Sequence, residues 1–95
     1  MMEVLNPVIG RAAFSKAGRD KGKLFIVVGI VDEDFVLIAD GDLRPAERPK
    51  KKRLKHLRFV DRTADAIVEK INSGSRVVSA DLRQVIREVQ ELLEG

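Results

Sequence analysis

The residues with the clearest potential for chemistry are the basic side chains crowded between Arg44 and Arg58. This stretch holds eight lysines and arginines against the single carboxylate of Glu47, so it carries +7 while the whole chain carries +3. Lysine ammonium groups meet phosphate oxygens with little geometric demand, and arginine adds a planar fork of donors. Such a concentration of like charge is typical of a protein that binds polyanions. The alternative interpretation is a solvated charge run with no partner.

A second group of cations lies in the glycine-rich segment from Ala17 to Lys23. Its two glycines, Gly18 and Gly22, permit positive φ angles and the close approach of another backbone. The segment does not fit the phosphate-binding loop of nucleotide hydrolases, because three residues separate the glycines and Leu24 follows Lys23. We therefore predict a basic loop that joins two strands.

No other group of side chains predicts catalysis, a metal site or a cofactor. The chain has one histidine and no cysteine, and the lone His56 makes no transition-metal site. The acidic run at Asp32–Asp34 is interpreted as a solvated turn, because the spacing of a calcium-binding loop is absent. We predict a protein that is not an enzyme. Without a signal peptide or an apolar run long enough for a bilayer, we expect a cytoplasmic protein that does not bind membranes.

Residues 1–60 alternate short apolar segments with turn signals, a pattern typical of a small β-barrel of about five strands. The predicted strands are Val8–Phe14, Leu24–Val31, Phe35–Ala39, one starting near Asp42, and Arg53–Val60. Gly29 predicts a bulge or bend in the second strand, and Asp40-Gly41 predicts a hairpin turn. Because proline cannot donate to a sheet, Pro45 and Pro49 predict a loop that continues through Lys52.

The pattern changes to helical spacing after Val60. Thr63 is the predicted N-cap of a first helix, and Asn72-Ser73-Gly74 is its predicted stop. Ser79 is predicted to cap a second helix, whose apolar stripe consists of Leu82, Val85, Ile86, Val89 and Leu93. We therefore predict a barrel over residues 1–60 and a helical C-terminal extension over residues 61–95, packed on the barrel or on a partner.

The strands around the glycine-rich loop resemble the KOW motif of ribosomal and transcription-associated proteins. The resemblance lies in Ile9–Phe14, Gly18–Gly22 and Phe25–Val28, and it continues through Gly29–Asp32 and Leu37–Gly41. It is closest to KOW-domain RNA-binding proteins similar to the archaeal and eukaryotic-type large-subunit ribosomal proteins with an N-terminal KOW domain. The resemblance implies an SH3-like barrel that binds structured RNA, usually ribosomal RNA.

Charge and resemblance together predict a non-catalytic, ribosome-associated protein that reads RNA backbone and shape, with ribosomal RNA and ribosomal proteins as partners. The predicted RNA-binding residues are Lys16, Gly18, Arg19, Lys21, Gly22, Lys23, Arg48, Lys50, Lys51, Lys52, Arg53, Lys55, His56 and Arg58. Base stacking is not expected, because the only aromatic residues are assigned to the core: Phe14, Phe25, Phe35 and Phe59.

A protein-interaction module with an acidic protein partner is the alternative function, because small barrels also dock peptides. The two amphipathic helices would then supply a partner surface or a weak homodimer contact. The basic run also matches the pattern of a nuclear localisation signal.

Overall fold

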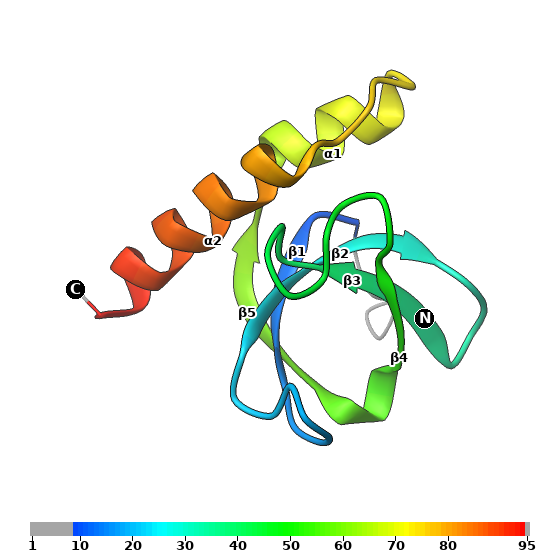
Figure 1. Cartoon of the computed structure of the whole chain (residues 1–95), viewed down its shortest axis with the longest axis vertical. Helices are drawn as coiled ribbons and strands as arrows, with labels where there is room; N and C mark the ends of the chain where they lie inside the picture. The colour runs from blue at the N-terminus through cyan, green and yellow to red at the C-terminus, as the bar shows by residue number, and fades with distance from the viewer. Residues whose placement is uncertain (1–8, 95) are drawn as a thin grey trace.

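The computed structural model describes residues 9–94 and shows a strongly curved antiparallel sheet with two helices on one side (Figure 1). The five strands are β1 (Arg11–Ser15), β2 (Leu24–Ile30), β3 (Phe35–Ala39), β4 (Lys50–Arg53) and β5 (Leu57–Thr63). They lie in the order β4-β3-β2-β1-β5. A 3-10 turn at Leu54–His56 carries the chain from one edge strand to the other. The predicted fold class, a small SH3-like barrel followed by two helices, is confirmed.

The central strand β2 is buried on both faces. Ile26 belongs to a cluster between the sheet and the helices, whereas Phe25 and Val27 belong to a second cluster inside the barrel. Successive side chains of a strand point to opposite faces, so burial of both faces explains the continuous apolar run in the sequence. The irregularity predicted at Gly29 is confirmed, because the pairing of β2 with β3 shifts register between Val27 and Gly29.

Helices α1 (Asp65–Asn72) and α2 (Ser79–Glu94) cover the outer face of the sheet. One cluster joins apolar residues of both layers: Ala12, Leu24, Ile26 and Ala39 from the strands with Ile67, Leu82, Val85 and Val89 from the helices. Leu93 was predicted in the apolar stripe but is 47% exposed, because the end of α2 extends past the sheet (Figure 1). Neither helix of the described chain has the length and apolar character that a membrane crossing requires.

The first strand begins later than predicted, at Arg11. Val8 lies outside the described residues, and Ile9 and Gly10 form a turn. This turn links two elements, since the Gly10 N–H donates to Val27 O at 2.7 Å and Gly10 O accepts from the Ala64 N–H at 2.8 Å. These bonds direct the Gly10 backbone to β2 and to the start of α1.

The predicted hairpin at Asp40-Gly41 is wrong, because residues 40–49 form a loop. Asp40 Oδ1 accepts the N–H groups of Asp42 and Arg44, both at 2.9 Å, so the chain turns back where a strand was expected. The next strand is β4, whose first three residues were predicted as loop. Pro49 precedes the first paired residue of β4 and therefore removes no bond from the ladder.

The predicted strand Arg53–Val60 is interrupted by the 3-10 turn, and β5 continues to Thr63. Thr63 is consequently not a cap. The N-cap of α1 is Ala64, which makes no side-chain capping bond. The predicted stop is confirmed, since α1 ends at Asn72.

Ser79 is the first residue of α2 and does not cap it. Its hydroxyl donates to the Glu47 carboxylate at 3.2 Å and accepts the Ala46 N–H at 3.0 Å, so it ties the 40–49 loop to the helix. Asp81 provides the side-chain hydrogen bond at the start of the helix instead, because its Oδ2 accepts the N–H of Val78, the residue before α2, at 3.1 Å.

Candidate nucleic-acid interface

The β1–β2 loop, residues 16–23, is held against the end of the barrel by the basic stretch between Arg44 and Arg58. The Lys16 N–H donates to His56 O in the 3-10 turn at 2.7 Å. The Lys52 ammonium group of β4 donates to Ala17 O at 3.0 Å. These bonds join segments that are far apart in the sequence, so the two groups of cations predicted from the sequence lie side by side.

Asp20 is the buried counterion of this contact. Its side chain is 4% exposed and accepts hydrogen bonds from Arg44 and Lys50, both at 3.1 Å. Burial raises the pKa of Asp20, but the hydrogen bonds and charges of Lys50 and Arg44 outweigh burial and hold the pKa below its ordinary value. Sequence reasoning missed Asp20; the only available signal was that so dense a cationic segment needs a compensating carboxylate nearby.

Lys52 is buried in the same contact, with 6% of its surface exposed. Burial lowers the pKa of its ammonium group, repulsion by Lys50 and Arg44 lowers it further, and Asp20 opposes them. Lys50 is half-buried beside it. The structure therefore places these two lysines underneath the β1–β2 loop, where their charges hold the loop in place.

The alternate residues of β4 point the other way. The Lys51 ammonium group lies 4.5 Å from the centre of the Phe35 ring, and the Arg53 guanidinium lies 5.0 Å from it. Phe35 was assigned to the core, but it is half-buried and belongs to neither core cluster. The reason is the alternation of β3, whose Val36 and Ile38 are the residues that face the barrel interior.

The other phenylalanines differ in how far they are buried. Phe25 is completely buried, as predicted. Phe14 and Phe59 are half-buried at the edges of the clusters and carry cations on their rings, with Arg58 at 4.9 Å and Arg11 at 5.2 Å. Cation–π contacts of this kind keep an arginine next to an aromatic surface while its charge stays in solvent.

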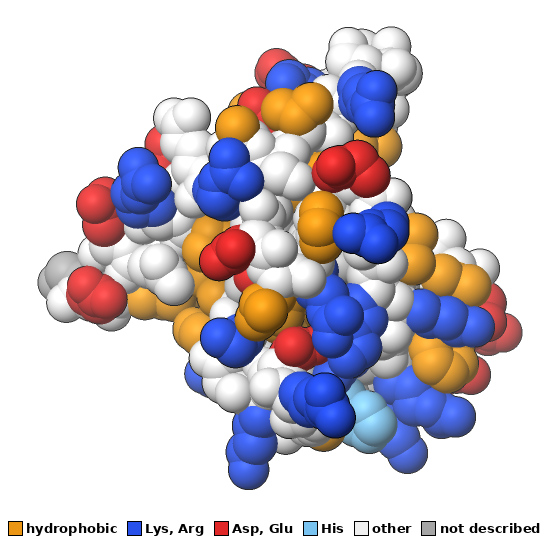
Figure 2. Space-filling view, viewed as in Figure 1, with side chains coloured by type: hydrophobic (Ala, Val, Ile, Leu, Met, Phe, Trp, Pro, Cys, Tyr) orange, Lys and Arg blue, Asp and Glu red, His pale blue; other side chains and the backbone are white. Residues whose placement is uncertain are grey.

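Most predicted site residues are exposed to solvent: Lys16, Gly18, Arg19, Lys21, Gly22, Lys23, Arg48, Lys51, Arg53, Lys55 and Arg58. Figure 2 shows lysines and arginines gathered around the histidine. Three of the cations, Lys16, Lys21 and Arg58, line one hollow of about 350 Å³ with Phe14. We call Lys16, Lys21, Lys55 and Arg58 the basic face.

His56 lies half-buried among these cations. Partial burial lowers its pKa below the ordinary 6.5, and the neighbouring charges of Lys55 and Lys52 lower it further. Its imidazole is therefore neutral at neutral pH and can accept or donate a hydrogen bond without adding charge. Within the described residues, no three histidine, aspartate or glutamate side chains come together as a metal site would require.

The fold and this surface define a class: a small KOW-type β-barrel with basic loops gathered at one end. A comparison with protein-family profiles found no match. Several curated proteins are similar. The first, "Putative ribosome-binding protein YbzG" of Bacillus subtilis (strain 168), is 36% identical over 72 residues, which cover 76% of this chain and 97% of that protein.

Other relatives, all archaeal, carry the name large ribosomal subunit protein eL14. That of Staphylothermus marinus is 33% identical over 57 residues, covering 60% of this chain and 59% of the relative. That of Aeropyrum pernix is 28% identical over 72 residues, covering 76% and 70%. The chain belongs to the same family as YbzG, and it is similar to the KOW-type eL14 proteins.

Proposed function

We propose that this protein is a non-catalytic, cytoplasmic ribosome-binding protein that contacts ribosomal RNA through the phosphate backbone. The observation that carries the proposal is the joining of the β1–β2 loop to β4 and the 3-10 turn, which concentrates exposed cations while the carboxylate of Asp20 is buried beneath them. The names of the relatives YbzG and eL14 support the ribosome as the partner.

The proposed contacts divide into two groups. Residues of the basic face and the neighbouring exposed cations Arg19 and Lys23 would meet phosphates directly. Lys50 and Lys52 would act from below, because their ammonium groups already bind Asp20 and the loop backbone. Such contacts position the protein on folded RNA and carry no sequence information of their own.

The test compares two double variants that remove the same charge. Lys16→Ala with Lys21→Ala removes two of the four charges of the basic face. Arg62→Ala with Arg76→Ala removes two exposed arginines elsewhere. We expect only the first to weaken binding to ribosomal RNA fragments and to reduce the slope of log affinity against log salt by about 1.4–1.8, the value for two phosphate contacts.

The result that contradicts the proposal is an equal loss of affinity in both double variants, which would indicate a general effect of net charge. An acidic polypeptide of the same charge serves as a competitor. If it displaces RNA as well as unlabelled RNA does, the alternative function with an acidic protein partner takes precedence.

A further inference from the structure

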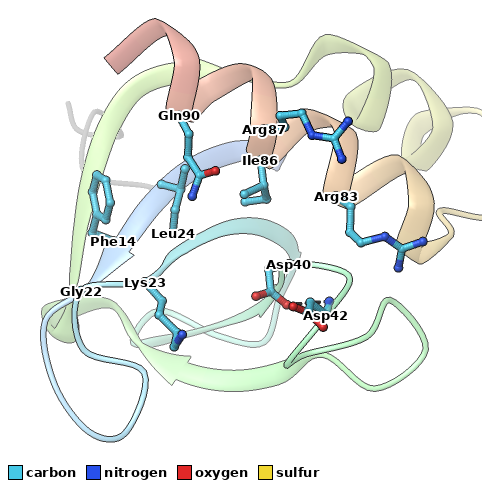
Figure 3. A pocket seen from close by; sticks show the side chains of 10 residues that line it. All are labelled: Phe14, Gly22, Lys23, Leu24, Asp40, Asp42, Arg83, Ile86, Arg87 and Gln90. Carbon is cyan, nitrogen blue, oxygen red and sulfur yellow. Dashed lines mark hydrogen bonds between the residues drawn. The ribbon is translucent and has the colours of Figure 1, made fainter. Parts of the chain in front are cut away.

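A cleft of about 430 Å³ opens between α2 and the β1–β2 hairpin (Figure 3). This volume lies within the range of about 300–1,000 Å³ that small-ligand pockets occupy. The cleft adjoins the hollow of the basic face, because Phe14 and Gly22 line both. An RNA strand that crosses the basic face would therefore reach the cleft without leaving the surface.

One part of the cleft wall is apolar, while the lining as a whole is more polar than apolar. Phe14 contributes an aromatic ring and Ile86 of α2 contributes aliphatic surface, both half-buried (Figure 3). Leu24 of β2 also lines the cleft but is only 4% exposed. Arg58 lies 4.9 Å from the centre of the Phe14 ring. A planar ring is the shape that gains most from aromatic and aliphatic walls of this kind, and every nucleobase offers one.

The polar side chains around the cleft differ in whether they already make hydrogen bonds or ion pairs within the protein. Arg83 donates to Gly41 O at 2.7 Å and so anchors α2 to the 40–49 loop. Lys23 and Arg87 are exposed, and their side chains make no hydrogen bond or ion pair to the residues that the structure describes. Gln90 places an amide, which offers both a donor and an acceptor, above Leu24 (Figure 3).

Two carboxylates complete the lining and favour one orientation of an anionic ligand. Asp40 and Asp42 lie at the end of the cleft away from Phe14 (Figure 3). They would repel a phosphate there, whereas Lys23 and Arg87, on opposite sides of the cleft, would each attract one (Figure 3). Carboxylates also accept hydrogen bonds from the amino groups of bases.

We propose that this cleft binds one unpaired RNA nucleotide, its base against Phe14 and Ile86 and its two flanking phosphates near Lys23 and Arg87. The inference rests on the proposed function and adds α2 to the RNA interface. It also revises the expectation that the phenylalanines play no part in stacking, because the Phe14 ring is open to the cleft.

The test measures affinity for an RNA hairpin with a single bulged adenosine and for the same hairpin without the bulge. We expect the protein to prefer the bulged RNA by about tenfold, the effect of one stacked base. Arg87→Ala with Gln90→Ala should abolish this preference and leave the affinity for the unbulged hairpin within about twofold, since a single phosphate contact carries little of the total. Arg62→Ala, another exposed arginine, serves as the matched control and should keep the preference.

Phe14→Leu tests the stacking wall separately. Leucine keeps an apolar side chain against the core, and a thermal melt establishes that the variant is folded. We expect it to lose the preference for the bulge. Equal binding of both hairpins by the unaltered protein, or equal losses for both in the Arg87 and Gln90 variant, overturns this inference alone. Failure to bind either hairpin overturns the proposed function with it.

Discussion

The ammonium group of Lys52 donates a 3.0 Å hydrogen bond to the carbonyl oxygen of Ala17, so the middle of β4 fastens the β1–β2 loop. Lys52 stands in the densest basic run of the chain, yet it is buried. Its neighbour Lys51 is exposed, because successive residues of a strand point to opposite sides. One run of cations thus contains both loop-anchoring and exposed side chains.

Replacing Lys52 with methionine is expected to destabilise the protein by about 1–3 kcal/mol, because the charge-assisted hydrogen bond to the half-buried Ala17 carbonyl is lost while the aliphatic stem is kept. The Ser15 hydroxyl still donates to that carbonyl, at 2.9 Å. Urea unfolding measures the change in the free energy of unfolding, and hydrogen exchange should show faster opening of residues 16–23. Lys51→Met is the control and should change stability by less than about 0.5 kcal/mol. A larger loss for Lys51→Met would contradict the assignment of the two faces of β4.

Asp20 should make the stability of the protein depend on pH in the acidic range. The pKa of Asp20 in the folded protein lies below its ordinary value of 3.8, so the folded state favours the carboxylate. The resulting stabilisation is complete above the unfolded-state pKa and is lost as the pH falls through the folded-state value. We expect the difference in unfolding free energy between the unaltered protein and Asp20→Asn to be largest near neutral pH and to shrink on acidification.

Urea unfolding of both proteins from neutral to strongly acidic pH makes this comparison. The other carboxylates titrate in both proteins, so their contributions cancel in the difference. Parallel stability curves would contradict the role of Asp20 as counterion of Lys50 and Arg44.

Gly41 is expected to tolerate alanine less well than another glycine with the same backbone conformation. Gly41 has φ +81°, and a Cβ atom there would collide with the Ser79 carbonyl oxygen at the start of α2. Gly74 has φ +79° with no atom within 4 Å of the added Cβ. Gly74→Ala should therefore cost only the left-handed backbone strain of about 1–2 kcal/mol, and Gly41→Ala should cost more. Thermal melts compare the stability of the two variants. An equal loss of stability in both would contradict the expectation that the contact with the Ser79 carbonyl oxygen adds to the cost at Gly41.

Much of the fold could be predicted from local patterns. Phe35–Ala39 was predicted with the bounds that the structure shows, and the end of α1 at Asn72 followed from the residues that stop it. These segments carry their signal in their own residues: an apolar run between turns, or a polar Asn-Ser-Gly after a helical stripe. The strand at Lys50–Arg53 has no such signal, since four basic residues between a proline and a turn are typical of a loop.

The candidate site was predicted in its composition but not in its arrangement. The sequence by itself determined that cations concentrate in two segments, because charge is a property of the residues. Tertiary structure decided which of them face solvent. Pairing of β4 with β3 supplies the backbone partners that make Lys50–Arg53 a strand, and its alternation then turns Lys50 and Lys52 toward Asp20 and Ala17. Burial of a lysine depends on contacts across the fold, and a count of charges along the chain cannot supply those contacts.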